Sequence, residues 1–253
     1  MGLRIAFDLD GVLADMEGEL ARHARELFGE RIADRTRDAE PPIDPERAAG
    51  GAGSAAAAAG DAADDGADAL PLQRLRLTPR ETRQLWRHVA KIDAFWESLK
   101  EIETGVVARL ASMAKEGRWE VIFLTRRPEC AGATAQLQTQ RWLEAKGFAL
   151  PSVFVVQNSR GKIAAALALD VVVDDRPENC LDVAVDSSAR AVLVWRDDAE
   201  RIPAATRRLG IGVVSSVAEC LDVLAHADSL ARAEPGVVDR VRRLLGLKQP
   251  AGA

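Results

Sequence analysis

The first apolar run of the chain ends in the sequence Asp8-Leu9-Asp10-Gly11. In an extended chain, residues two apart point to the same side, so both carboxylates would face one site. Such a pair suits phosphoryl transfer: one ionised acid attacks phosphorus, while the other protonates the leaving oxygen and later takes a proton from water. Like charges this close resist joint ionisation, so the chemistry requires a divalent cation. The structural alternative is an acidic turn between a strand and a loop.

Thr125 closes a second apolar run, Val121 to Leu124, and is followed by Arg126 and Arg127. A hydroxyl and the adjacent backbone amides can hold a phosphoryl oxygen, and one of the two arginines can contact the phosphate. The alternatives are a helix or turn cap for Thr125 and solvated loop positions for the arginines.

Lys162 lies at the start of an expected helix, Gly161 to Leu169. There its ammonium can neutralise both the nucleophile and the transferring phosphoryl oxygens. It is not the lysine of a nucleotide P-loop, because Val156 stands where glycine is needed and Ile163 follows in place of Ser or Thr. The alternative is a surface lysine.

Asp174 and Asp175 end the apolar run Val171 to Val173. Adjacent acids on a buried strand are costly unless a cation or hydrogen-bond donors compensate them. Mg²⁺ would do so, since it is held by one or two carboxylates together with waters and phosphate oxygens. The competing interpretation is a structural ion pair with Arg176.

The polar groups follow apolar runs that are typical of buried parallel strands. We expect strands over residues 3–8, 119–125, 152–157, 170–174 and 190–195. We expect helices to about residue 115 and over residues 134–146, 162–168 and 178–185. This alternation predicts a doubly wound α/β domain, in which ligands bind at the carboxyl ends of the strands.

An insertion interrupts this pattern between residues 15 and about 100. Its segment Ala48 to Ala69 consists almost entirely of Ala, Gly and Asp, which predicts a flexible stretch, with a short Ala-rich helix as the alternative. A helix start is expected at Thr78 to Glu81, where a capping residue precedes Pro and Glu. In the tail, Val213 to Ala225 and Val237 to Leu247 are expected to be helical.

The composition narrows the possible partners. The 253 residues carry a net charge of −5, which gives no electrostatic reason to expect nucleic-acid binding. Three scattered cysteines suit reduced thiols in the cytoplasm better than a disulfide framework. No secretory signal and no run of about 20 apolar residues is apparent, so we expect a soluble, cytoplasmic protein without a membrane partner.

The four motifs together resemble the haloacid dehalogenase (HAD) superfamily of phosphohydrolases. The matching residues are Asp8-Leu9-Asp10-Gly11-Val12, Thr125, Lys162 and Asp174-Asp175, and the resemblance covers roughly residues 3–14 and 97–198. It implies a Rossmann-like three-layer parallel sheet with a helical cap inserted after the first strand. The implied boundaries are residues 1–14 and 101–212 for the core, 15–100 for the cap and 213–253 for a helical extension.

The resemblance also implies roles for the motif residues. Asp8 would be the nucleophile that forms an aspartyl phosphate, and Asp10 the general acid and base. Thr125 and Lys162 would bind phosphate, with Arg126 as a further candidate. Mg²⁺ would be held by Asp8, by the Asp10 carbonyl and by one or both of Asp174 and Asp175. Asp10 also argues against the dehalogenase branch, which lacks this second acid.

Within the superfamily, the chain looks most like the 5′(3′)-deoxyribonucleotidases. The similarity lies in the short spacing from Lys162 to Asp174, the run Asp174 to Pro177, and the stretch Phe95 to Leu99. A second similarity, to the 3′-phosphatase domains of polynucleotide kinases, rests on Leu124 to Arg126 and Gln140 to Leu143.

Aromatic residues that could stack on a base are few. The candidates are Trp86, Phe95 and Trp96, and core packing is favoured because Trp96 continues the apolar helical face of Leu85 and Val89. The expected function is that of a Mg²⁺-dependent phosphomonoesterase for a small phosphorylated metabolite, with a nucleoside monophosphate favoured. The alternatives are a polynucleotide-type 3′-phosphatase, a sugar-phosphate phosphatase, a phosphotransferase and a non-catalytic HAD-fold binding protein.

Overall fold

The computed structural model describes residues 2–29 and 77–233. The chain forms two compact units, one made of Met1–Met16 and Ala90–Ala253 and the other of Glu17–Val89. We refer to them as the core unit and the inserted unit. The predicted flexible segment Ala48 to Ala69 and the predicted helix Val237 to Leu247 lie outside the described residues.

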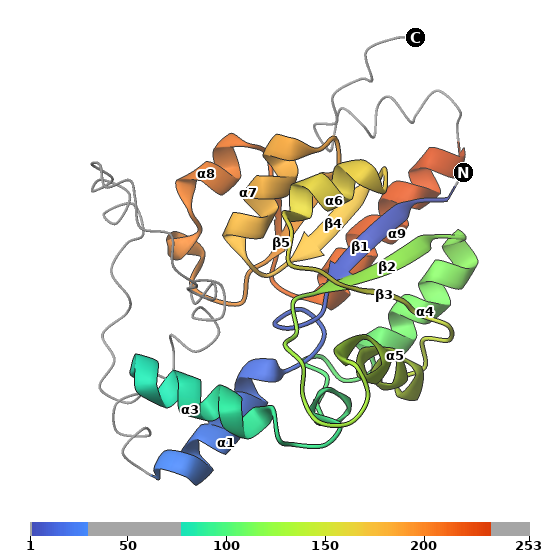
Figure 1. The fold of residues 1–253 in the computed structure, drawn as a ribbon. Helices are drawn as coiled ribbons and strands as arrows, with labels where there is room; N and C mark the ends of the chain where they lie inside the picture. Colours follow the sequence, from blue (N-terminus) through green and yellow to red (C-terminus); the bar gives the residue numbers. More distant parts are fainter. Residues whose placement is uncertain (1, 30–76, 234–253) are drawn as a thin grey trace. The chain divides into compact units, whose positions relative to one another are not determined.

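The core unit is built on a parallel six-stranded sheet (Figure 1). Its strands are β1 (Arg4–Asp8), β2 (Glu120–Thr125), β3 (Ser152–Val155), β4 (Val171–Asp174), β5 (Arg190–Val194) and β6 (Gly212–Val214). They lie in the order β3-β2-β1-β4-β5-β6, and every pairing is parallel. The predicted α/β class and all five predicted strands are confirmed.

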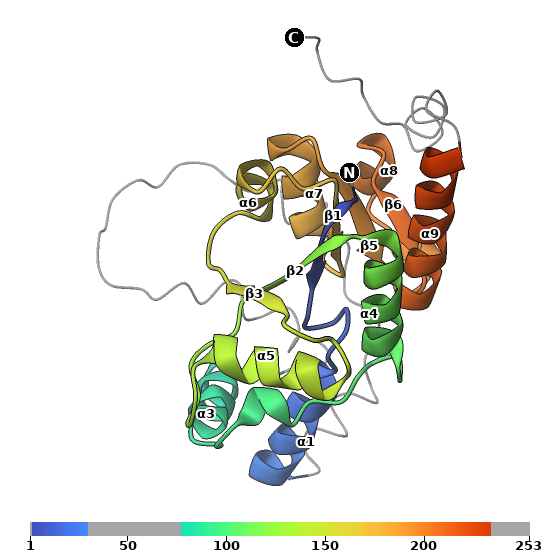
Figure 2. The ribbon, with the colours of Figure 1, turned by 90° about the vertical axis from the view of Figure 1, so that its right-hand side faces the viewer.

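Helices cover both faces of the sheet, as the continuous apolar strands require. The core unit contains α4 (Val106–Gly117), α5 (Ala135–Ala145), α6 (Arg160–Ala166), α7 (Pro177–Asp186), α8 (Ala204–Arg208), α9 (Val217–Ala233) and the short 3₁₀ turns η4 (Phe95–Glu97) and η5 (Ala199–Arg201). Figure 2 shows α6 and α7 on one face and α4 and α9 on the other. Under α6 and α7, alternate residues of four strands, including Ala6, Leu124, Val172 and Leu193, form one buried cluster.

Two helix predictions were wrong in position. The segment from Val213 is not helical, because Gly212–Val214 pairs with β5 as an edge strand and α9 begins only at Val217. The apolar face that runs through Leu85 and Val89 does not continue as one helix to Trp96. The intervening backbone instead bonds to a distant loop, with the Ala131 N–H donating to the Ala90 carbonyl at 2.9 Å.

The inserted unit contains α1 (Met16–Phe28) and α3 (Pro79–Val89). The predicted start of α3 is confirmed: the N–H of Glu81 donates to Thr78 Oγ1 at 3.3 Å, and the Glu81 carboxylate accepts from the Thr78 N–H at 2.7 Å. In the parts of the chain that the structure describes, no helix has the length and apolar character needed to cross a membrane.

Candidate active site

Asp8 and Asp174 come together because β1 and β4 are neighbours whose carboxyl ends share one edge of the sheet. Asp8 is 8% exposed and Asp174 is 1% exposed. Arg160, at the start of α6, lies between them: its Nη2 donates to Asp8 Oδ1 at 2.7 Å, and its Nε lies 3.7 Å from Asp174 Oδ2. One buried guanidinium therefore faces both acids.

The second acid motif is held by the loop that enters α7. Asp174 Oδ1 accepts from the Arg176 N–H at 2.9 Å and from Asn179 Nδ2 at 3.1 Å. Asp175 differs, because its Oδ1 is buried and has no hydrogen-bond partner among the described residues. Buried polar atoms are rarely left without a partner, so this oxygen is a candidate metal ligand.

Burial is the largest cause of the raised pKa values of these acids. Burial, followed by the charge of Asp174, raises the pKa of Asp8 well above its usual range, and Arg160 offsets part of this shift. Burial also raises the pKa of Asp174. The pKa of Asp175 rises to about 8, through burial and then the charge of Asp174. All three shifts have the same main cause, the burial of acids beside one another, and a bound cation would oppose it.

The residues fit a bound Mg²⁺. Mg²⁺ prefers carboxylate and carbonyl oxygens, and the site offers buried acids, including the Asp175 oxygen that has no partner in the described parts of the chain. The residues that would hold the ion are Asp8, the Asp10 carbonyl, Asp174 and Asp175.

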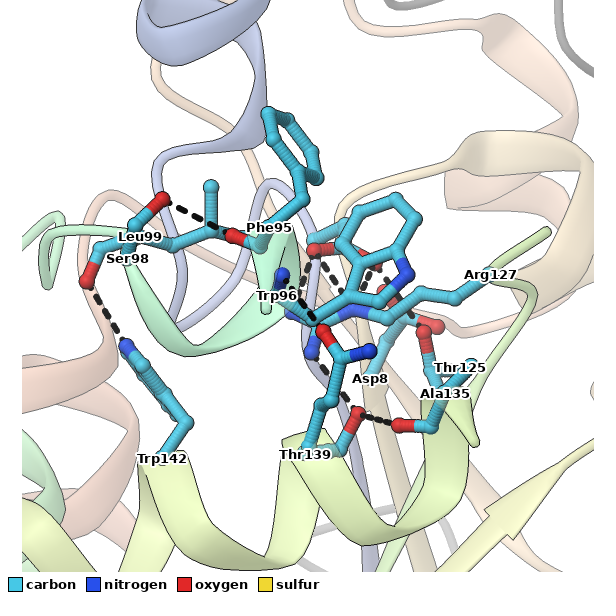
Figure 3. Close-up of polar contacts among 12 residues, drawn as sticks. Asp8, Phe95, Trp96, Ser98, Leu99, Thr125, Arg127, Ala135, Thr139 and Trp142 are labelled. Atoms are coloured by element: carbon cyan, nitrogen blue, oxygen red, sulfur yellow. Dashed lines mark hydrogen bonds and ion pairs between the residues drawn. The ribbon is translucent and has the colours of Figure 1, made fainter. Parts of the chain in front are cut away.

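Asp10 is fixed by a network that the sequence did not reveal, and Figure 3 shows its members Thr125 and Arg127 together with Thr139 and Trp96. Arg127 donates to it through Nε at 2.9 Å and Nη2 at 2.7 Å, and the Thr125 hydroxyl donates at 3.0 Å. The Arg127 side chain is itself fully buried; its Nη1 donates to Thr139 Oγ1 at 2.8 Å, and its guanidinium lies 4.8 Å from the ring centre of Trp96. The network fixes the orientation of the Asp10 carboxylate.

The structure separates the predicted phosphate-binding residues. Thr125 lies at the site, but its hydroxyl donates to Asp10. The Arg126 Nε donates to Gln157 Oε1 at 2.8 Å. Lys162 is exposed and, within residues 2–29 and 77–233, its ammonium has no partner, whereas Arg160 two residues earlier contacts Asp8.

Three contributors to the site were missed in the sequence. Asn179 carries no local signal, since it lies inside a helix that the sequence predicts only as covering the sheet. Arg127 was noted beside Arg126, but nothing local distinguishes the two. Arg160 precedes Lys162 in the first turn of the same helix. The only sequence signal that could have selected Arg160 over Lys162 is the apolar face of α6, which shows the side of the helix that is buried.

The interpretation of Phe95 and Trp96 as core residues is confirmed, because both are 0% exposed. Trp96 Nε1 donates to the Pro128 carbonyl at 3.1 Å, and its ring faces Arg127. Neither ring is available to stack on a base. Trp86, in the inserted unit, is partly exposed.

The loop after β1 is tied to the rest of the core unit by Arg196. Its Nη1 donates to the Gly11 carbonyl at 2.6 Å, and its Nη2 donates to the Val12 carbonyl at 3.1 Å and to Glu103 at 2.7 Å. Glu103 also accepts from the Val217 N–H at 2.7 Å, at the start of α9. Burial alone would raise the pKa of Glu103, but the hydrogen bonds from Arg196 and α9 outweigh it and lower the pKa.

We expect Glu103→Gln to lower the free energy of unfolding at pH 7 by about 1–2 kcal/mol, because it removes charge-assisted hydrogen bonds. A pKa lowered by folding stabilises the protein above the unfolded pKa. This stabilisation begins to decline below about pH 4.5, the ordinary value, and is lost as the pH falls through the lowered pKa of the folded state. Urea unfolding at pH 7 and pH 4 checks this. The difference from wild type should shrink at pH 4, and the exposed Glu144→Gln should show little difference at either pH. A pH-independent difference would contradict the role of the charge.

Gly11 allows Asp175 to approach the loop. It has φ +87°, and a Cβ built on it would lie 2.0 Å from Asp175 Oδ2. We expect Gly11→Ala to displace Asp175 and to weaken Mg²⁺ binding by at least about tenfold, the usual minimum for disturbing the support of a metal ligand. Isothermal titration with Mg²⁺ checks this.

The control for Gly11→Ala is Gly105→Ala. Gly105 has φ +80°, so alanine meets the same backbone strain there, but nothing lies within 4 Å of the added Cβ. Both variants should lose about 1–2 kcal/mol of stability from this strain. If both also bound Mg²⁺ like wild type, the contact between Gly11 and Asp175 would have no role in the site.

Comparison with solved structures identifies the fold. A crystal structure described as a dehalogenase with an intermediate complex matches 88% of this chain and 98% of its own, with a TM-score of 0.51 and 15% identity. The chain has the haloacid dehalogenase fold. In this HAD fold, the inserted unit, Glu17–Val89, follows β1 along the chain.

Two further matches have TM-scores below 0.5, so the fold assignment does not depend on them. A putative beta-phosphoglucomutase from Thermotoga maritima has a TM-score of 0.47 and 19% identity over 88% of this chain and 99% of its own. A HAD family hydrolase from Deinococcus radiodurans R1, with bound phosphate and sodium, has a TM-score of 0.48 and 19% identity over 98% of both chains. No protein-family model and no curated protein matches the sequence.

Proposed function

We propose that the protein is a Mg²⁺-dependent phosphomonoesterase that acts through an aspartyl phosphate on Asp8. The observation that supports this most directly is the buried group of Asp8, Asp174 and Asp175. Arg160 lies between the first two, and Asp175 Oδ1 has no hydrogen-bond partner within residues 2–29 and 77–233. This arrangement suits a bound cation and a phosphoryl group, whose charges compensate one another.

In the first half of the reaction, a carboxylate oxygen of Asp8 attacks phosphorus in line with the leaving alcohol. A phosphorus–oxygen bond forms to Asp8 while the ester bond breaks, and Asp10 gives its proton to the departing oxygen. Arg160 already donates to Asp8 Oδ1 and is placed to stabilise negative charge on the phosphoryl oxygens.

In the second half, Asp10 takes a proton from water, which attacks the phosphorus of the aspartyl phosphate. The bond from phosphorus to Asp8 breaks, inorganic phosphate leaves, and both carboxyl groups return to their starting states. Arg127 and Thr125 keep the Asp10 carboxylate in one orientation through both steps. The bound Mg²⁺ would supply charge stabilisation on the transferring group.

The proposed substrate class is a small phosphorylated metabolite, and nucleoside monophosphates are the first to test. The resemblance to deoxyribonucleotidases supports that choice. Burial of Phe95 and Trp96 removes two candidate base-stacking residues, so recognition of a base has to come from other residues.

The test is phosphate release from a panel of nucleoside monophosphates, sugar phosphates and 3′-phosphorylated oligonucleotides, with Mg²⁺ and with a chelator. We expect release that requires Mg²⁺, with a small monoester as the best substrate. Preference for the oligonucleotide would favour the polynucleotide-type alternative. Transfer of phosphate to an added nucleoside would indicate a phosphotransferase, and Mg²⁺ binding without any turnover would favour a binding protein. Equal release with chelator would contradict the metal dependence.

A further inference from the structure

A cluster of side chains of the types that bind metal ions lies within the inserted unit. His23 and Glu26 come from α1, and His88 comes from α3. One ligand atom from each lies within 4.8 Å of the other two. The chain contains three histidines, so two of the three meet here although they are 65 positions apart in sequence.

Two of the three separations within this cluster match a tetrahedral metal site. With Zn–N and Zn–O bonds of about 2.0–2.1 Å, two ligands of a tetrahedral ion are roughly 3.3–3.4 Å apart. His23 Nδ1 lies 3.3 Å from His88 Nε2 and 3.4 Å from Glu26 Oε2. Both separations are long for hydrogen bonds, whose usual length is about 2.7–3.2 Å.

Neighbouring side chains orient the cluster. Arg22 Nη1 contacts Glu26 Oε1, which leaves Oε2 of that carboxylate directed at His23. The other nitrogen of His23, Nε2, lies 3.4 Å from Glu19 Oε1 and 2.7 Å from Arg22 Nη2. The Arg22 guanidinium can only donate, so it holds Nε2 as an acceptor; binding of an ion through Nδ1 requires this contact to break and the ring proton to move to Nε2, on the side of Glu19. His23 is 6% exposed, so its ring position is fixed by packing.

We propose that the inserted unit binds a divalent transition metal ion, with Zn²⁺ as the expected occupant, through His23 Nδ1, His88 Nε2 and Glu26 Oε2. Two imidazoles and one carboxylate suit Zn²⁺ rather than Mg²⁺, which prefers oxygen ligands. The fourth position is left for water. The ion cross-links α1 to α3 and stabilises the folded inserted unit.

The test is Zn²⁺ titration of the full chain, without an affinity tag and with excess Mg²⁺ to occupy the acidic site. We expect wild type and His226→Ala to bind one Zn²⁺ tightly, because His226 lies on α9, outside the cluster. His88→Ala and Glu26→Gln should each weaken this binding by at least about tenfold. Glu26 provides a mild second variant, since its side chain is 54% exposed and its replacement disturbs little packing.

Two further readouts are independent of turnover. Zn²⁺ should raise the thermal unfolding temperature of wild type and His226→Ala but not of the two cluster variants. In NMR spectra, the imidazole signals of two histidines should shift with Zn²⁺ while those of His226 stay unchanged. Equal Zn²⁺ binding by all four proteins, or no binding by wild type, would overturn the proposal and leave the proposed phosphatase activity unaffected.

Discussion

Asp8→Asn should abolish phosphate release, lowering the rate by at least about 10⁴-fold, as removal of a nucleophile does in other covalent mechanisms. An amide cannot form the aspartyl phosphate, whereas its size and its contact with Arg160 are nearly preserved. The measurement is phosphate release by wild type and variant at saturating Mg²⁺, with circular dichroism to show that the variant is folded.

Two companion variants sharpen this result. Asp10→Asn keeps the nucleophile, so we expect slow turnover and accumulation of phosphorylated protein, which acid quench and mass spectrometry can detect. Asp186→Asn makes the same chemical change at an exposed position on α7 and should leave the rate within about twofold of wild type. If Asp8→Asn kept more than a few per cent of wild-type activity, Asp8 would not be the nucleophile.

The second large effect is expected at Arg160. Arg160→Met removes the cation that contacts Asp8 and faces Asp174, and we expect the rate of phosphate release to fall by about 10²- to 10³-fold. Lys162→Met, two residues along the same helix, removes an exposed cation and should change the rate by no more than about twofold. Steady-state kinetics on both variants measures the difference.

Arg160→Lys is the control for a possible loss of folding in Arg160→Met. Loss of one partner of a buried ion pair can cost about 3–5 kcal/mol, so Arg160→Met needs a variant that keeps the charge. Lysine keeps the charge but not the fork that faces two acids, and we expect intermediate activity in a folded protein. If Lys162→Met were the inactive variant and Arg160→Met were normal, the assignment by sequence motif would be right and the one by geometry wrong.

Local patterns in the sequence predicted most of the fold. Apolar runs buried on both faces identified five of the six strands, and the acids directly after two of them indicated the site edge. The sixth strand was missed because Gly212–Val214 is short and lies at the edge of the sheet. Its extended conformation comes from pairing with β5, which its amino-acid composition does not indicate. The sequence placed all four aspartates of this edge, Asp8, Asp10, Asp174 and Asp175, at or just after the ends of two strands.

The sequence by itself determined the order of the strands along the chain, the acids at their ends and the capping residues that start α3. The tertiary structure decided which basic residues face those acids. Residues two apart on a helix point about 200° apart, so only one of Arg160 and Lys162 can face the sheet edge. Close packing of Gly161 against α7, where a Cβ would lie 2.2 Å from the Asp182 carbonyl, fixes that rotation and turns Arg160 inward. Arg127 likewise differs from Arg126 only in its tertiary contacts, because Thr139 on α5 and Trp96 in η4 hold its guanidinium.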